Sequence, residues 1–152
     1  LSRRKCAEVA ALRPKDLVIA ADTMVFVNNR ALGKPHSEEE AARMRATLSG
    51  RLHTVYTGVT VSLEGKTITS HEMTSVRFRT LTQADIIRYI ATGEPMDKAG
   101  AYGIQGYGSV LVEGISGDYY NVMGLPVCRL ARMLVRFGVD PLALAAEKER
   151  TT

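Results

Sequence analysis

The chain has 152 residues, 45% of them hydrophobic and 24% charged, with a net charge of +4. These proportions are typical of one globular domain with a core of its own, and they exclude disordered and fibrous proteins. No apolar run approaches the roughly 20 residues that span a membrane, and residues 1–5 lack the apolar core of a secretory signal, so we expect a cytoplasmic protein without membrane association.

The first part of the chain predicts a helix, a strand and a turn. Residues 3–12 have helical spacing, and residues 17–21 form an apolar run typical of a strand buried on both faces. Asp22 ends this run, and residues 24–27 continue the strand. An ionised carboxylate in such a place must be hydrogen-bonded, paired or bound to a cation. Asn28-Asn29 then indicates a turn.

A second helix and a hairpin follow. Ser37 with Glu38, Glu39 and Glu40 predicts a capping box, and the helix it opens directs Ala41, Met44 and Leu48 inward and ends at Gly50. Residues 55–63 and 67–78 are rich in β-formers and are separated by the turn residues 64–66. This pattern predicts an antiparallel hairpin.

The second half alternates helices with a glycine-rich segment. Thr82 and Asp85 cap a helix that runs to Ala91, and residues 100–108 are glycine-rich. Further along the chain we expect a strand over residues 110–112, a helix from Pro126 to Phe137 and a last helix after Asp140-Pro141. Because strands and helices do not alternate strictly, the sequence predicts an α/β fold with a mixed sheet flanked by helices.

The cysteines and histidines offer no metal site. Cys6 and Cys128 are far apart and are interpreted as buried small hydrophobes, although a single bridge between them remains open. His36, His53 and His71 lack the spacing of metal ligands, which favours surface or ordinary polar roles.

Polar residues in apolar or glycine-rich settings are the candidates for chemistry. Asp22 could serve an active site, cap a turn or pair with Lys34, and Lys34 could approach a ligand or lie in a solvated turn. Lys98 follows Asp97 at the start of the glycine-rich segment, where Gln105 could read a base or merely occupy a tight turn. Lysines and a carboxylate that converge on one cleft would suit a polyphosphate with a divalent metal.

Seven short motifs then occur in a recognisable order along the chain. They are Ala21-Asp22-Thr23, Leu32-Gly33-Lys34-Pro35, Leu48-Ser49-Gly50-Arg51, His53-Thr54-Val55-Tyr56-Thr57-Gly58, Gly93-Glu94-Pro95, Asp97-Lys98-Ala99-Gly100-Ala101-Tyr102-Gly103-Ile104-Gln105-Gly106 and Gly124-Leu125-Pro126. In this order they resemble the motifs of the Maf family of nucleoside triphosphate pyrophosphatases, also called septum formation proteins. The resemblance extends from about Lys5 to Gly138.

The resemblance implies a fold and a reaction. The fold would be a long twisted mixed sheet with two lobes and a central cleft, like that of the inosine triphosphate pyrophosphatases. A water assisted by Mg²⁺ or Mn²⁺ would attack between the α- and β-phosphates and release a nucleoside monophosphate and pyrophosphate. Asp22 falls on the family's catalytic proton acceptor, and Lys5, Lys34 and Lys98 fall on its phosphate-binding positions. Asp22 is also the residue that could bind the metal.

Thr23 and Gln105 fall on the family positions tied to base selection. With the string Tyr102-Gly103-Ile104-Gln105-Gly106 they resemble the branch that acts on dTTP and UTP, and modified pyrimidine nucleotides would share the same base edge. An amide both donates and accepts, so Gln105 can pair with the O4 and N3–H edge of a pyrimidine.

The resemblance also implies features beyond the site. The whole of residues 1–152 would be a single Maf-like domain that lacks the family's N-terminal strand and its Ser-x-Ser-Pro-Arg-Arg segment. We expect the given sequence to be part of a longer one, since loss of a core strand would expose a sheet edge. A homodimer is the expected assembly.

Two alternative functions remain at this stage. One is a catalytically weak, nucleotide-binding regulator of cell division and septum formation. The other is a nucleic-acid-binding module that would use Arg129, Arg132 and Arg136 on one helix face. We expect no nucleic-acid partner, because these arginines fit the solvated face of an amphipathic helix whose apolar side packs inward through Leu130, Met133, Leu134 and Phe137.

Overall fold

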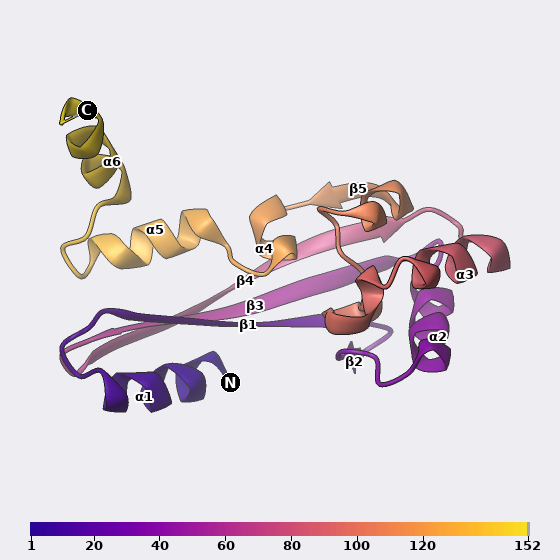
Figure 1. Cartoon of the computed structure of the whole chain (residues 1–152), viewed down its shortest axis with the longest axis horizontal. Helices are drawn as coiled ribbons and strands as arrows, with labels where there is room; N and C mark the ends of the chain where they lie inside the picture. The colour runs from indigo at the N-terminus through magenta and orange to yellow at the C-terminus, as the bar shows by residue number, and fades with distance from the viewer. Residues whose placement is uncertain (152) are drawn as a thin grey trace.

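The structure, a computed structural model, describes residues 1–151 and is built on one long, twisted, five-stranded sheet (Figure 1). In space the strands follow the order β2-β1-β3-β4-β5, with the bounds Arg30–Leu32, Val18–Val27, Leu52–Leu63, Lys66–Phe78 and Val112–Ser116. The predicted α/β class with a long twisted sheet flanked by helices is confirmed. Within residues 1–151 every strand pair is antiparallel, so the expected mixture of strand directions is not found.

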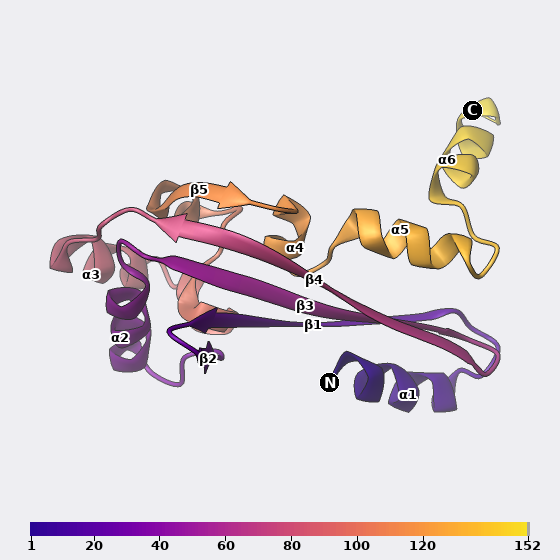
Figure 2. The ribbon, with the colours of Figure 1, turned by 180° about the vertical axis from the view of Figure 1, so that it is seen from behind.

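Helices cover the two ends of this sheet (Figures 1 and 2). α2 (Glu38–Leu48) and α3 (Gln83–Ala91) lie at one end, together with three short 3-10 helices, η1 (Glu94–Asp97), η2 (Ala99–Ala101) and η3 (Tyr107–Leu111). Near the other end, α1 (Ser2–Leu12) and α5 (Val127–Val135) lie on opposite faces, while α4 (Tyr119–Met123) precedes α5 and α6 (Pro141–Arg150) follows it. No helix in residues 1–151 is both long and apolar enough to cross a membrane.

The β3–β4 hairpin forms as its sequence predicts. The register pairs Leu63 with Lys66, so the turn consists of Glu64 and Gly65. Both residues have positive φ, +47° and +84°, as a tight two-residue hairpin turn requires. Because side chains alternate along a strand, this register fixes which residues of β3 and β4 face the core.

β1 continues beyond Asp22 to Val27, as the sequence predicts for residues 24–27. Asp22 ends the apolar run but not the strand, since it pairs with Gly58 of β3, and Thr23 pairs with Thr57. The strand is not buried on both faces as expected, because Ile19 is 42% exposed. The predicted turn at Asn28 and Asn29 is confirmed by φ angles of 50° and 61°, and it leads into β2.

The helix caps agree with prediction except in one detail. The side chain of Ser37 accepts a hydrogen bond from the Glu40 N–H, but the Glu40 carboxylate accepts one from His36 instead of completing the capping box. Thr82 and Asp85 form the full reciprocal box at α3. Each cap satisfies an N–H group of the first helical turn that has no partner inside the helix.

The structure also corrects the expected start of a strand in the second half of the chain and the expected burial of Cys128. Residues 110 and 111 belong to η3, so the strand expected over residues 110–112 starts only at Val112. Cys6 is buried as expected and Cys128 is exposed, and both are free thiols, so no bridge joins them.

The helix α5 is amphipathic as predicted. Leu130, Met133 and Leu134 are buried and pack in one cluster with Val59 and Val61 of β3. On its other side Arg129 forms an ion pair with Glu72 of β4, with 2.8 Å between Nε and Oε2. Arg129 therefore stabilises the contact between α5 and the sheet.

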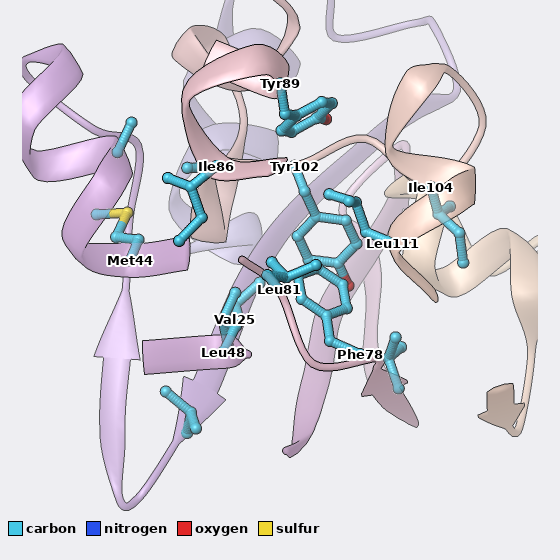
Figure 3. Close-up of a cluster of buried hydrophobic side chains, with 14 of the residues drawn as sticks. Val25, Met44, Leu48, Phe78, Leu81, Ile86, Tyr89, Tyr102, Ile104 and Leu111 are labelled. Atoms are coloured by element: carbon cyan, nitrogen blue, oxygen red, sulfur yellow. The ribbon is translucent and has the colours of Figure 1, made fainter. Parts of the chain in front are cut away.

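The larger core lies at the opposite end, where α2, α3 and the 3-10 helices pack on β1, β3 and β4 (Figure 3). Its aromatic residues surround two polar ones that sequence reasoning did not place there. Arg45 of α2 is fully buried, and its guanidinium lies 4.4 Å from the ring centre of Tyr89 and within 5.8 Å of those of Phe78 and Tyr102. No hydrogen-bond partner for this guanidinium occurs in the described part of the chain. The aromatic faces therefore stabilise its charge in place of hydrogen bonds.

His53 shares this core. It is 2% exposed, and its Nε2 lies 2.7 Å from the Tyr102 hydroxyl. Burial, together with the charge of Arg45, lowers the pKa of His53 to about 4. The imidazole is therefore neutral at pH 7, in an ordinary polar role within the core.

The burial of neutral His53 predicts that the free energy of unfolding decreases at acid pH. An unfolded histidine takes up a proton near pH 6.5, but folded His53 does so only near pH 4, so stability should fall as the pH drops through this window. The shift corresponds to about 3 kcal/mol between pH 7 and pH 4. When the free energy of unfolding is measured in urea at several pH values, His53→Gln should remove the contribution of His53 to its pH dependence. The contribution of the carboxylates should remain. Parallel stability profiles of the variant and the wild type over pH 4–7 would contradict this assignment.

Candidate functional site

The main cavity opens beside the middle of the sheet and has a volume of about 480 Å³, which suits a small organic ligand. Its walls come from β1, β3, the segment from Glu94 to Gly106 and the end of α4. The lining residues used below are Thr23, Glu94, Lys98, Gln105 and Gly124. Three predicted site residues, Thr23, Lys98 and Gln105, thus meet at one cavity.

Thr23 is held in the wall by a chain of hydrogen bonds. Its hydroxyl lies 2.9 Å from that of Thr57, which donates in turn to the backbone carbonyl of Asn121 in α4 at 3.3 Å. Asn121 is fully buried and donates to the carbonyls of Val55 and Glu72 and to the Thr74 hydroxyl. This network fixes α4 against the sheet and so fixes the cavity wall opposite the glycine-rich segment.

The glycine-rich segment forms the other wall. Gly100 has a φ of +70°, and a Cβ there would lie 3.0 Å from a methyl group of Val25, so a larger residue would be strained and crowded. Ile104 is buried and anchors the segment in the core, while the next residue, Gln105, is exposed. The backbone thereby presents the Gln105 side chain at the cavity.

Lys98 stands at the rim with a carboxylate beside it. Its ammonium lies 2.9 Å from Oδ1 of Asp97 and donates to the Glu94 carbonyl at 3.5 Å. The hydrogen bond from Lys98 and its charge, with a smaller effect of Lys34, hold the pKa of Asp97 below its usual value. Lys34 is exposed in the loop after β2, whose Gly33 carbonyl accepts a hydrogen bond from Gly100. Lys34 and Lys98 therefore place positive charge on the same side of the molecule.

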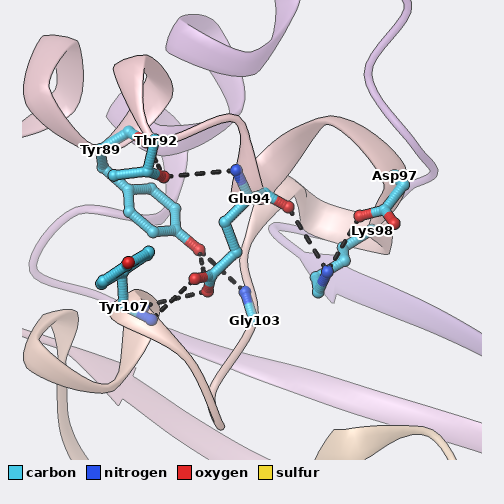
Figure 4. Close-up of polar contacts among 8 residues, drawn as sticks. Tyr89, Thr92, Glu94, Asp97, Lys98, Gly103 and Tyr107 are labelled. Carbon is cyan, nitrogen blue, oxygen red and sulfur yellow. Dashed lines mark hydrogen bonds and ion pairs between the residues drawn. The ribbon is translucent and has the colours of Figure 1, made fainter.

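Glu94 also lines the cavity, and sequence reasoning missed its part. Its Oε1 accepts hydrogen bonds from the Tyr89 hydroxyl at 2.8 Å and the Gly108 N–H at 3.1 Å, and its Oε2 accepts one from the Tyr107 N–H at 2.7 Å (Figure 4). Burial raises the pKa of Glu94, but these hydrogen bonds and the charge of Lys98 outweigh it, so the pKa is lowered overall. The signal was present in the motif Gly93-Glu94-Pro95, where an acidic residue precedes a glycine-rich segment.

Asp22 and Lys5 lie on the other face of the sheet. They form an ion pair of 2.8 Å, so Asp22 pairs with Lys5 and not with Lys34, the partner considered from the sequence. Asp22 lines a smaller pocket of about 230 Å³ that also contains Tyr56 and His71, whose rings stack 5.0 Å apart. Gly58, opposite Asp22, leaves room for α1, since a Cβ there would lie 3.2 Å from the Ser2 hydroxyl.

Asp22 and Thr23 link the two groups of predicted site residues, because they are neighbours in β1. Adjacent residues of a strand point to opposite faces, which separates Asp22 from Thr23. A ligand that contacts both groups must therefore reach both faces of β1.

The carboxylates do not form a metal site by themselves. Within residues 1–151 no three acidic, histidine or cysteine side chains gather as ligands for a metal ion. Glu94 and Asp97 are already engaged by donors. Asp22, contacted by Lys5 at one oxygen, is the carboxylate best placed to share a cation with a ligand.

A cavity of this size, with an amide, a hydroxyl and nearby lysines, suits a small, polar, anionic ligand. The chain belongs to the Maf family, because the family model described as Maf-like protein matches residues 1–137. The family resemblance noted in the sequence is thereby confirmed.

Curated relatives with the name dTTP/UTP pyrophosphatase are similar to most of the chain. The relative from Bacillus pumilus is 50% identical over 141 residues, which cover 93% of this chain and 75% of the relative. The relative from Moorella thermoacetica is 54% identical over 142 residues, covering 92% and 73%. One from Bacillus cereus is 49% identical over 140 residues, again covering 92% and 73%.

Proposed function

We propose that this protein hydrolyses dTTP and UTP to the nucleoside monophosphate and pyrophosphate, and that it accepts modified pyrimidine nucleotides with the same base edge. The observation that carries the proposal is that Thr23, Lys98 and Gln105 meet at one cavity in a chain about half identical to relatives named for this reaction. The 480 Å³ cavity is large enough for a nucleoside.

The base occupies the cavity between Thr23 and Gln105. The Gln105 amide donates to O4 of the pyrimidine and accepts from its N3–H, and the Thr23 hydroxyl limits the approach on the β1 side. Cytosine has a donor in place of O4 and an acceptor in place of N3–H. It therefore leaves polar groups unpaired unless the side-chain amide of Gln105 flips. Such mismatches are the main source of selectivity in polar pockets.

The triphosphate extends from the cavity towards Asp22 and Lys5. Lys98 and Lys34 neutralise it on the cavity side, and Lys5 does so on the other face. Asp22 then accepts a proton from the attacking water. The new bond forms between the water oxygen and the α-phosphorus, the bond from the α-phosphorus to the bridging oxygen breaks, and pyrophosphate leaves with that oxygen.

Mg²⁺ or Mn²⁺ would be held by Asp22 together with the phosphates of the substrate. Mg²⁺ is commonly bound by one or two carboxylates plus substrate phosphates, and Asp22, with one of its oxygens on Lys5, fits that mode. The ion would supply charge stabilisation to the phosphates during the transfer.

The role of Asp22 predicts a large loss of activity in Asp22→Asn. The amide cannot take up the proton, so turnover of dTTP should fall by about 10²–10⁴-fold while the thermal unfolding curve changes little. Asp16→Asn is the matched control, because Asp16 is exposed and forms a surface ion pair with Arg13. Separation of the products from dTTP, UTP, CTP, ATP and GTP provides the measurement. Activity retained in Asp22→Asn would place the base elsewhere, and diphosphate with orthophosphate as products would contradict the reaction.

The role of Gln105 predicts a changed base preference in Gln105→Glu. An ionised carboxylate accepts but cannot donate to O4, so kcat/KM for dTTP and UTP should fall by roughly 10²-fold. The value for CTP should fall less, because the 4-amino group of cytosine can donate to the carboxylate. Gln83→Glu on the exposed start of α3 makes the same chemical change away from the cavity and should leave the profile intact. An unchanged ratio of dTTP to CTP hydrolysis in Gln105→Glu would refute this role.

The proposed cation predicts that activity disappears in excess chelator and returns on addition of Mg²⁺ or Mn²⁺. Turnover of dTTP is measured after dialysis against chelator and after titration of each ion. The folded state should persist without the ion, since no described side-chain cluster depends on it. Full turnover in chelator would remove the cation from the reaction.

A further inference from the structure

Gln105 depends on its backbone for its orientation. Its side chain makes no hydrogen bond to any residue in the described part of the chain, and it lies exposed between Ile104 and Gly106. A flexible amide in a mobile loop could not discriminate donors from acceptors, because a site must hold its groups to within about 0.5 Å. Something must therefore hold the loop over residues 103–108.

Glu94 meets this requirement from inside the loop (Figure 4). Its two carboxylate oxygens accept from the N–H groups of Tyr107 and Gly108 and from the Tyr89 hydroxyl. The same Tyr89 hydroxyl accepts from the Gly103 N–H at 3.0 Å. Two side chains thus satisfy three backbone donors on both sides of Gln105.

The glycines of the loop fit closely around this carboxylate. A Cβ at Gly106 would lie 2.5 Å from Oε2 of Glu94, and one at Gly103 would lie 2.8 Å from Oε1. Neither position could carry a side chain while Glu94 keeps its place. The loop backbone therefore wraps the carboxylate directly, with little room for another arrangement.

The ring of Tyr89 is held in place by the buried guanidinium of Arg45. The Arg45 guanidinium lies 4.4 Å from the Tyr89 ring centre, and the Tyr89 side chain is 5% exposed. An arginine stacked on a ring face holds the ring and attracts the carboxylate beyond it. Arg45, Tyr89 and Glu94 form a continuous path from the core to the cavity wall.

We propose that Glu94 is a positioning residue for base selection, supported by Tyr89 and Arg45, which holds the loop over residues 103–108 so that Gln105 faces the base. This inference assumes the pyrophosphatase activity proposed above. Glu94 is not a catalytic base, since both of its oxygens are already engaged by donors.

Amide hydrogen exchange in the free protein tests the loop directly. Glu94→Gln places an NH₂ group against backbone donors, so the amides of Tyr107 and Gly108 should exchange about tenfold faster, as expected for a lost hydrogen bond to a charged acceptor. Tyr89→Phe keeps the ring on Arg45 and removes the hydroxyl, so it should release the amide of Gly103. Glu113→Gln on the exposed face of β5 is the matched control and should change none of these amides.

Substrate selectivity tests the functional part of the inference. In Glu94→Gln the ratio of kcat/KM for dTTP to that for CTP should fall about tenfold through KM for dTTP, with a smaller change in kcat. Arg45→Met, of similar length without the charge, should shift the ratio in the same direction. Unchanged exchange in the loop, or an unchanged ratio in a folded variant whose loop has loosened, would overturn the inference. If the wild type hydrolyses no nucleotide, the proposed function fails, while the exchange result still decides whether Glu94 holds the loop.

Discussion

The alternation of side chains along β1 is the constraint on which the site depends. Because Asp22 and Thr23 are neighbours in one strand, one must face α1 and the other the main cavity. In the described residues β3 is the strand that pairs with residues 18–24 of β1, and the pairs Asp22–Gly58 and Thr23–Thr57 fix the face that each side chain takes. A ligand that contacts both Asp22 and Thr23 must therefore reach both faces of β1.

The second feature is the support that the buried Arg45 gives to the glycine-rich wall of the cavity. Glycine-rich loops adopt many conformations, and ordering one costs conformational entropy. Here the loop over residues 103–108 wraps around Glu94, and Tyr89 links that carboxylate to the stacked Arg45. The guanidinium has aromatic faces in place of hydrogen bonds. An unpaired buried cation destabilises a core, so its presence there is explained if it stabilises the wall of the cavity.

Much of this arrangement can be read from the sequence. The β3–β4 hairpin, the caps of α2 and α3 and the inward face of α5 follow from turn residues and periodicity, which are local properties. The family resemblance also identified Thr23, Lys98 and Gln105, which the structure brings to one cavity. The directions of the β1–β3 and β4–β5 pairs and the burial of Arg45 could not be predicted, because they depend on partners distant in sequence. The exposure of one face of β1 was missed for a similar reason, since an apolar run does not show which of its residues the distant elements cover.

The most direct test is a crystal structure of the protein with a dUTP analogue whose α–β bridge cannot be hydrolysed, grown with Mg²⁺. We expect the uracil in the cavity against Thr23 and Gln105, and the α-phosphorus near Asp22 and Lys5. A base bound in the smaller pocket beside Tyr56 and His71, or a triphosphate confined to the cavity side without approach to Asp22, would contradict this account.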